Sequence, residues 1–221
     1  MSLTSKLTGI ILAGGKSRRM GGRNKAFLDG GADPLIGPVV ERVQSVCAEV
    51  LIVAGDTGPY AGLGVPVAED RFRGVGVLGG MHAGLEAASH ELALVVGCDM
   101  PFLNPALLQA FAVWAQGFDV AILRHEPAPA LSPPFHGGDG PQGQGGQSVE
   151  PLHGAYRRTC LPAIEAAIDA GERRIISFFP QVAVRYVTPD EVVPLDPGLD
   201  SFRNVNTPEE WARVKKEWQT R

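Results

Sequence analysis

The chain has 221 residues, 44% of them hydrophobic and 20% charged, a composition typical of one globular domain with a core of its own. Its net charge of −4 argues against a broad nucleic-acid surface, because proteins that follow phosphate backbones usually carry an excess of Lys and Arg. The three cysteines are widely spaced, the apolar runs are too short to span a bilayer and no cleavable signal is visible, so we expect a cytoplasmic protein without disulfides, zinc or a membrane segment.

Short apolar runs alternate with amphipathic stretches through the first part of the chain. We predict strands at 8–13, 50–54, 65–68, 92–97 and 119–123, and helices at 38–46, 79–88 and 105–116. A proline in the third of these strands places it near an edge of the sheet. Apolar strands alternating with helices predict an α/β fold, with a doubly wound, mostly parallel, Rossmann-like sheet covered by helices on both faces.

A different composition separates this part from the rest. From Glu126 to Ser148 the chain is dense in Pro, Gly and Gln and lacks the apolar spacing of a core element, so we predict a flexible excursion. Strands are predicted beyond it at 151–156 and 185–187, with a helix at 161–170. Thr207, Pro208 and Glu210 predict the start of a final helix, with Thr as the cap, Pro in the first turn and Glu completing a capping box.

The first predicted strand runs into a basic, glycine-rich stretch. Gly14 and Gly15 allow a sharp backbone turn that leaves amide N–H groups available to phosphate oxygens. Ser17 can add a hydroxyl donor, and the charge that a triphosphate needs can come from Arg18, Arg19 and Lys25. From composition alone, the alternative is a glycine turn beside a solvated basic face.

This stretch matches the end of the P-loop motif but not its start. Gly15-Lys16-Ser17 matches the end of the P-loop motif, which also needs a glycine at position 10, where this chain has isoleucine. A slip of one residue moves the amides that hold phosphate. We therefore exclude a P-loop ATPase or GTPase.

Two aspartates follow predicted strands. Asp99 should lie at the carboxyl end of the strand at 92–97, where open α/β sheets bind ligands. Mg²⁺ takes few protein carboxylates and completes its shell with phosphate oxygens and water, so Asp99 is a candidate metal ligand. The alternatives are a helix cap near Asn104 or a loop aspartate. Asp70 is a candidate for a base or ribose contact, with an exposed turn as the alternative.

Polar residues near the end of the chain are harder to interpret. Asn204 and Asn206 would project to the same face if residues 202–207 are extended. They could meet a metal, a substrate or only the start of the last helix. The five histidines show no metal-ligand spacing and no paired acid, so we assign them no catalytic role.

Together these segments resemble the molybdenum cofactor guanylyltransferases, also called molybdopterin-guanine dinucleotide synthases. That family opens with L-A-G-G-x-S-x-R-M-G-x-x-K, with slight variation in spacing, and residues 12–25 are LAGGKSRRMGGRNK. Similarity to further family motifs lies in GVLGGM at 76–81, GCDMP at 97–101, GERR at 171–174 and FRNVNTPEE at 202–210. The likeness covers nearly the whole chain except the Pro/Gly-rich excursion.

The resemblance implies a nucleotidyltransferase that moves GMP from GTP to the terminal phosphate of molybdenum-bearing molybdopterin and releases pyrophosphate. It implies catalytic roles for Arg19, Lys25 and Asp99, with Asp99 also holding Mg²⁺. The nucleotide site that we infer comprises Leu12, Ala13, Gly14, Gly15, Ser17, Lys25, Asp70, Gly79 and Asp99. The acceptor side that the resemblance implies comprises Arg173, Arg174, Asn204 and Asn206.

This interpretation makes residues 1–221 one domain with a nucleotide-binding half at 1–124, a flexible insertion at 125–150 and an acceptor-binding half at 151–221. GTP and molybdopterin are then the small-molecule substrates. Molybdoenzymes that accept the cofactor, or their chaperones, are the implied protein partners, and neither nucleic acid nor a membrane is expected.

Two positions depart from the family pattern. Val77 stands where the second glycine motif usually has proline, and Val53-Ala54 stands where the family often has a nucleoside-contacting asparagine. Gly14 favours GTP, because relatives that use CTP carry L-A-A-G at the opening. The alternatives are a cytidylyltransferase or another nucleotidyltransferase with a different acceptor, and a nucleotide-binding module without catalysis.

Overall fold

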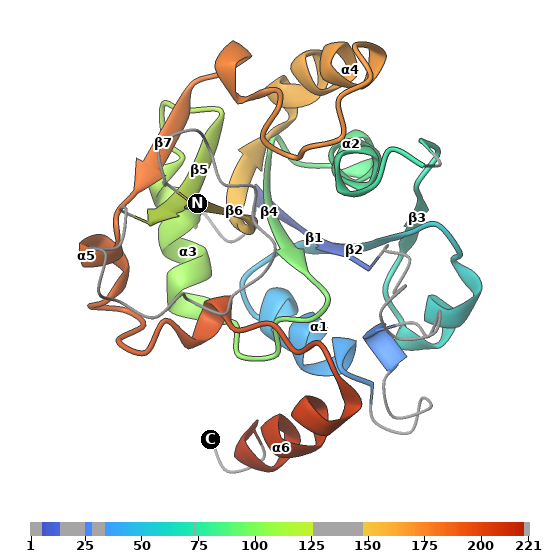
Figure 1. The fold of residues 1–221 in the computed structure, drawn as a ribbon, viewed down its shortest axis with the longest axis vertical. Helices are drawn as coiled ribbons and strands as arrows, with labels where there is room; N and C mark the ends of the chain where they lie inside the picture. Colours follow the sequence, from blue (N-terminus) through green and yellow to red (C-terminus); the bar gives the residue numbers. More distant parts are fainter. Residues whose placement is uncertain (1–5, 14–24, 28–33, 73, 126–147, 219–221) are drawn as a thin grey trace.

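In the computed structural model of the protein, the described residues are 6–13, 25–27, 34–72, 74–125 and 148–218. They form one seven-stranded sheet in the order β3-β2-β1-β4-β6-β5-β7 (Figure 1). The strands are β1 (Leu7–Leu12), β2 (Glu49–Ala54), β3 (Val67–Glu69), β4 (Leu92–Gly97), β5 (Val120–His125), β6 (Ser148–Arg157) and β7 (Val184–Val187). The helices are α1 (Ile36–Gln44), α2 (Val77–Ala87), α3 (Pro105–Trp114), α4 (Leu161–Asp169), α5 (Pro189–Val192) and α6 (Pro208–Trp218).

The direction of the strands confirms the predicted α/β class. β3, β2, β1 and β4 are parallel neighbours, and β5 runs parallel to β7. β6 lies between β4 and β5 and is antiparallel to both. The chain passes from β1 to β2 on one side and returns to β4 on the other, so the strand order reverses at β1. In open α/β sheets the crevice at such a reversal, at the carboxyl ends of the strands, is the usual ligand site.

Helices cover both faces of the sheet, as predicted. In Figure 1, α1 and α3 lie on one side of the sheet, and α2 and α4 lie on the other. Ile11 belongs to the cluster under α1 and α3, whereas its neighbours Ile10 and Leu12 belong to the cluster under α2 and α4. This division follows from the alternation of side chains along a strand. Gly84 lets α2 approach closely, because a Cβ there would lie 2.5 Å from Ile10 Cγ2.

The last helix begins at the predicted capping box. The Glu210 N–H donates to Thr207 Oγ1 (3.1 Å), and Glu210 Oε2 accepts from the Thr207 N–H (3.3 Å) and from the Asn206 N–H (2.7 Å). The buried face of α6 forms a separate small cluster, made of Leu35, Phe102, Val205, Trp211 and Val214. That cluster attaches the end of the chain to the turn that follows β4.

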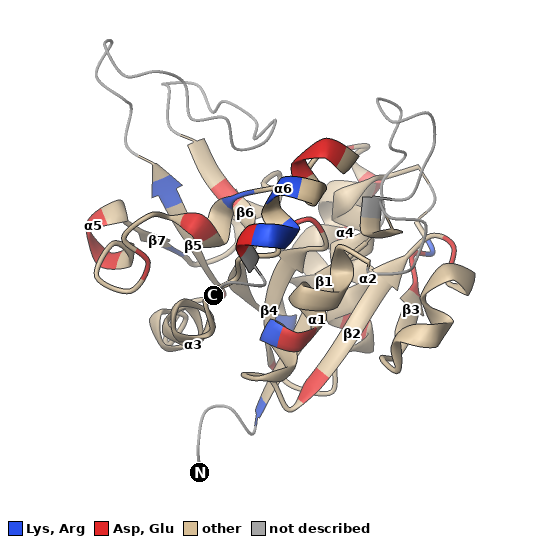
Figure 2. Cartoon of the chain, turned by 90° about the horizontal axis from the view of Figure 1, so that it is seen from below, with Lys and Arg blue, Asp and Glu red and all other residues tan. Residues whose placement is uncertain are grey.

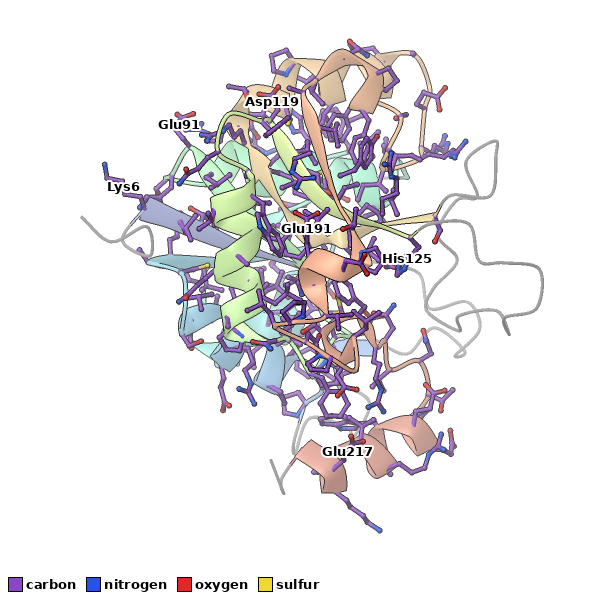
Figure 3. The ribbon with its side chains drawn as sticks, turned by 90° about the vertical axis from the view of Figure 1, so that its left-hand side faces the viewer. Lys6, Glu91, Asp119, His125, Glu191 and Glu217 are labelled. Carbon is purple, nitrogen blue, oxygen red and sulfur yellow. The ribbon has the colours of Figure 1, made fainter. Side chains whose placement is uncertain are left out.

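Two paired strands flank the Pro/Gly-rich segment. Residues 126–147 lie outside the described residues, but His125 ends β5 and Ser148 opens β6, and these two residues are paired in register. β-ladder hydrogen bonds thus extend the two strands beyond the apolar run of each, to residues 125 and 148. His125 lies at the edge where β5 ends, opposite the edge where Lys6 and Glu91 lead into β1 and β4 (Figure 3).

Charged side chains are mixed on the surface of the described part. Figure 2 shows Lys and Arg beside Asp and Glu on α6, and the net charge of the whole chain is −4. No helix among the described residues combines the length and apolar character needed to cross a membrane.

Candidate functional site

The carboxyl ends of the central strands are joined by backbone hydrogen bonds just before the glycine-rich stretch. The Ala13 N–H donates to the Val53 carbonyl (2.9 Å), and the Cys98 N–H donates to the Leu12 carbonyl (3.1 Å). The end of β1 is therefore held between the ends of β2 and β4. As a result, Leu12, which lies two residues before the glycine-rich stretch, is bonded to the turn that carries Asp99.

Asp99 is half-buried in the turn directly after β4. Its backbone carbonyl accepts a hydrogen bond from the Val205 N–H (2.8 Å). A Cβ on Gly97 would lie 2.7 Å from Asp99 Oδ1, so this carboxylate occupies space that only a glycine leaves open. Asp99 is not the cap of α3, because Asn104 Oδ1 accepts from the Ala106 N–H (2.9 Å) and caps that helix itself.

We expect Gly97→Ala to lower turnover by about 10- to 100-fold, since displacing a reacting group by roughly 1 Å can cost that much. The added methyl group would push the Asp99 carboxylate out of its position. Turnover and urea denaturation should be measured in parallel. Gly37→Ala is the matched control, because a Cβ at that position in α1 meets no atom within 4 Å. Unchanged turnover in Gly97→Ala would show that the position of this carboxylate does not matter.

Asp70 follows the edge strand β3 and is fixed by two hydrogen bonds. Its N–H donates to the Ala54 carbonyl (3.2 Å), and its Oδ1 accepts from the Phe72 N–H (3.0 Å). A Cβ on Gly79 would lie 3.0 Å from Asp70 Oδ1 and 2.9 Å from Phe72 Cβ, so the glycine permits this close approach. Partial burial raises the pKa of Asp70, although the Phe72 N–H and His82 act in the opposite direction. The carboxylate is thus a positioned acceptor rather than a freely exposed side chain.

The start of α2 is shaped by glycines. Gly74 and Gly76 have φ angles of 90° and 81°, which side chains rarely adopt. Val77 is the first residue of α2, a position that suits proline well. The helix therefore starts at the same position with valine here as it would with the proline of the family pattern. Arg173 donates from Nη1 to the Gly74 carbonyl and so reaches this turn from beyond α4.

The other proposed acceptor residues are only partly brought together. Val205 is buried in the small cluster with α6 and lies between Asn204 and Asn206 in the chain. Asn204 is half-buried and Asn206 is exposed. Arg174 is exposed, and the hydrogen bond at this residue is made by its carbonyl, which accepts from the Ser177 N–H (3.0 Å).

The remaining residues predicted to bind or act on the nucleotide belong to the glycine-rich stretch and its end at Lys25. Gly14, Gly15, Ser17 and Arg19 lie outside the described residues, and Lys25 begins the 3₁₀ turn η3 (Lys25–Phe27). Leu12, Ala13, Asp70, Gly79 and Asp99 are the predicted nucleotide-site residues that the structure assembles at one edge of the sheet.

A divalent metal ion would find a suitable ligand in Asp99. The described residues contain no group of three or more His, Cys, Asp or Glu side chains arranged to hold a metal. Mg²⁺, however, binds nucleotides with only one or two protein carboxylates and takes the remaining oxygens from phosphates and water. The half-buried Asp99 carboxylate after β4 fits that mode.

Contacts of two further residues at this edge of the sheet could not be predicted from the sequence. Tyr60, in the 3₁₀ turn η4 (Gly58–Leu63), donates from its hydroxyl to the Ala13 carbonyl (2.9 Å). The only sequence signal was a lone aromatic residue in a glycine-rich loop. Near the end of β5, the Arg124 guanidinium lies 4.6 Å from the centre of the Tyr186 ring, a contact that joins β5 to β7 and that no local pattern reveals.

Comparison with known proteins agrees with this geometry. Residues 9–184 match the family model described as "MobA-like NTP transferase domain". The chain is 38% identical to a molybdenum cofactor guanylyltransferase from Desulfosudis oleivorans, with 95% of this chain and 94% of that protein covered. It is 36% identical to a probable molybdenum cofactor guanylyltransferase from Pelotomaculum thermopropionicum, with 94% and 91% covered.

A solved structure extends the likeness to three dimensions. The molybdopterin-guanine dinucleotide biosynthesis protein A from Archaeoglobus fulgidus superposes with a TM-score of 0.73 at 25% sequence identity. The match covers 97% of this chain and all of that one.

Proposed function

The chain belongs to the family of MobA-like NTP transferase domains, and from that membership we propose that it is a molybdenum cofactor guanylyltransferase. It transfers GMP from GTP to the phosphate of molybdenum-bearing molybdopterin and releases pyrophosphate. GTP and molybdopterin are its small-molecule substrates, and the product is the guanine dinucleotide form of the cofactor.

One observation in the structure supports a nucleotide site at this edge of the sheet. The hydrogen bond from Cys98 to Leu12 holds the turn with Asp99 against the residues that lead into the glycine-rich stretch. A carboxylate suited to a nucleotide-bound metal ion therefore follows a residue that is bonded to Leu12, two positions before the segment whose amides and basic side chains are proposed to bind phosphate. Nucleotidyl transfer requires these two elements together.

The chemistry needs no activated nucleophile. The acceptor phosphate is already anionic, so one of its oxygens attacks the α-phosphorus of GTP directly. The bond from that phosphorus to the bridging oxygen breaks, and pyrophosphate leaves with the electron pair. The protein contributes alignment and charge neutralisation. We assign Arg19 and Lys25 to the phosphates, Asp70 to the nucleoside and Asp99 to the metal ion.

Mg²⁺, when bound at Asp99, would neutralise charge on the phosphates. The acceptor side is proposed to include Asn204, Asn206 and Arg173. Val205 links this side to the metal-binding turn through its hydrogen bond to the Asp99 carbonyl.

Guanine selectivity rests on the relatives rather than on the end of β2. Val53 and Ala54 are both buried and contribute backbone groups there, so they supply no polar side chain for a base. Discrimination between bases is therefore proposed to come from the opening stretch, where Gly14 agrees with the use of GTP. We further propose a cytoplasmic location and delivery of the product to molybdoenzymes or their chaperones.

The deciding experiment measures pyrophosphate release with Mg²⁺ and molybdopterin, offering GTP, CTP, ATP and UTP separately. We expect release with GTP alone, and none when the acceptor is omitted. Release with CTP alone would assign the protein to the cytidylyl branch. Tight nucleotide binding without release from any of the four would indicate a non-catalytic nucleotide-binding module.

A further inference from the structure

We propose that Tyr60 is a positioning residue that holds both ends of the glycine-rich stretch in place for the nucleotide. The inference rests on the proposed function and adds to it a residue outside every motif of the sequence. Tyr60 is only 1% exposed, although it belongs to a short 3₁₀ turn in a glycine-rich loop after β2. Its own N–H donates to the Thr57 carbonyl (3.1 Å), which fixes the turn that carries it.

The first contact is polar and lies at the start of the stretch. β1 ends at Leu12, so the Ala13 carbonyl lies beyond the last residue of the strand. The Tyr60 hydroxyl donates to this carbonyl oxygen at 2.9 Å. A partly buried carbonyl without a partner would be costly, so the hydroxyl favours this one orientation of the Ala13 peptide.

The second contact is apolar and lies at the far end of the stretch. The Phe27 ring packs on Tyr60, with ring centroids 5.2 Å apart and planes inclined by 54°. Ala26, which precedes it, is fully buried in the core. Lys25, assigned to the phosphates, is thus followed at once by two residues that are anchored in the core and on Tyr60.

One side chain therefore contacts the residue before Gly14 and the second residue after Lys25. Because both contacts involve the same buried side chain, Tyr60 links the two ends directly, and this link adds to the Ala13–Val53 hydrogen bond at one end and the buried Ala26 at the other. Fixing the ends in advance lowers the ordering cost that a nucleotide must meet on binding. The effect of losing Tyr60 should consequently fall on the nucleotide and not on the acceptor.

The chain provides a matched control in Tyr156. This residue is also fully buried, and its hydroxyl also donates to a backbone carbonyl, that of Pro151, at 2.6 Å. Tyr60→Phe and Tyr156→Phe remove the same atom and the same kind of hydrogen bond. Only the first of these bonds lies at an end of the glycine-rich stretch.

Nucleotide binding should be measured by calorimetry with GTP and Mg²⁺, together with KM for GTP and for molybdopterin. We expect Tyr60→Phe to weaken GTP binding about 5- to 10-fold, the scale of one lost hydrogen bond. Its KM for molybdopterin should stay unchanged. Tyr156→Phe should leave GTP binding as in the wild type. A second variant, Phe27→Leu, tests the other contact with the hydroxyl retained and should also weaken GTP binding.

Wild-type GTP binding by both Tyr60→Phe and Phe27→Leu would overturn the inference. Equal weakening in Tyr60→Phe and Tyr156→Phe would overturn it as well, since that would indicate general destabilisation. Failure of the proposed function appears differently, as wild-type protein that binds a nucleotide other than GTP or transfers nothing. The comparison of variants is then made with the nucleotide that the wild type binds, and the same outcomes apply.

Discussion

Asp99→Asn should lower nucleotidyl transfer by about 10²- to 10³-fold while the fold is retained. The substitution keeps the size of the side chain and the backbone carbonyl that accepts from Val205, but it removes the charge that suits a metal ion. A lost metal ligand costs several kcal/mol of transition-state stabilisation, which corresponds to a fall in kcat of about 10²- to 10³-fold. Single-turnover pyrophosphate release with GTP, Mg²⁺ and molybdopterin gives the measurement.

The control for this variant is Asp190→Asn. It removes the same charge from an exposed position in the first turn of α5. It should turn over like the wild type, and both variants should unfold at similar urea concentrations. Near-normal turnover in Asp99→Asn would remove this residue from the mechanism.

The second large effect is expected for His153, which should make the stability of the protein depend on pH. Its side chain is fully buried between Phe111 and Phe202, with ring centroids 5.2 Å and 4.5 Å away. Neither ring nitrogen has a hydrogen-bond partner among the described residues. Burial lowers the pKa of His153 to about 4, because the imidazolium cannot be solvated there.

The direction of this pH dependence follows from the protonation of His153 in the folded and in the unfolded chain. Between about pH 6.5 and pH 4 the unfolded chain binds a proton at this histidine and the folded protein does not. Lowering the pH through this range therefore favours unfolding, by roughly 2 kcal/mol at pH 5 for this group alone. The pKa values of Glu49 and Asp119 are lowered in the folded protein, so these residues also lose stabilising interactions as the pH falls. That loss occurs mainly below their ordinary pKa values of 4.5 and 3.8, which is mostly outside the pH range used here.

His153→Leu should remove this dependence. Urea denaturation at pH 8 and at pH 5 should show that the variant loses about 2 kcal/mol less than the wild type between the two conditions. The measurement at pH 8 serves as the internal control for changes in packing, which act at both pH values. Parallel losses in the two proteins would mean that His153 titrates normally in the folded state.

Much of the fold could be predicted because its elements have local signals. Apolar runs bounded by glycines predicted the strands that form β1, β2 and β4, and the Thr207 capping box predicted the start of α6. The antiparallel direction of β6 could not be predicted, because the neighbours of a strand and its direction beside them depend on contacts between residues far apart in the sequence. α5, which spans only Pro189–Val192, was missed because one helical turn is too short to show a period.

The same division applies to the candidate site. Asp99 and Asp70 were predicted as site residues because each follows a predicted strand, and strand ends are where open sheets bind ligands. In the structure both follow strands, β4 and β3. Tyr60 was missed because its hydrogen bond to Ala13 arises only when the loop after β2 folds back on β1. His153 showed no functional pattern, and its burial is set by aromatic residues from α3 and from the segment before α6.

The bond between Val205 and Asp99 has a consequence for the order in which the protein matures. During synthesis the first hundred residues can pair β3, β2, β1 and β4, since all four strands have then been made. The turn with Asp99 still lacks the N–H that holds its carbonyl, because Val205 is synthesised long after Asp99. Nascent chains would therefore pair these four strands before the turn with Asp99 is held in place, so the candidate site would be completed only after residue 205 has folded onto it.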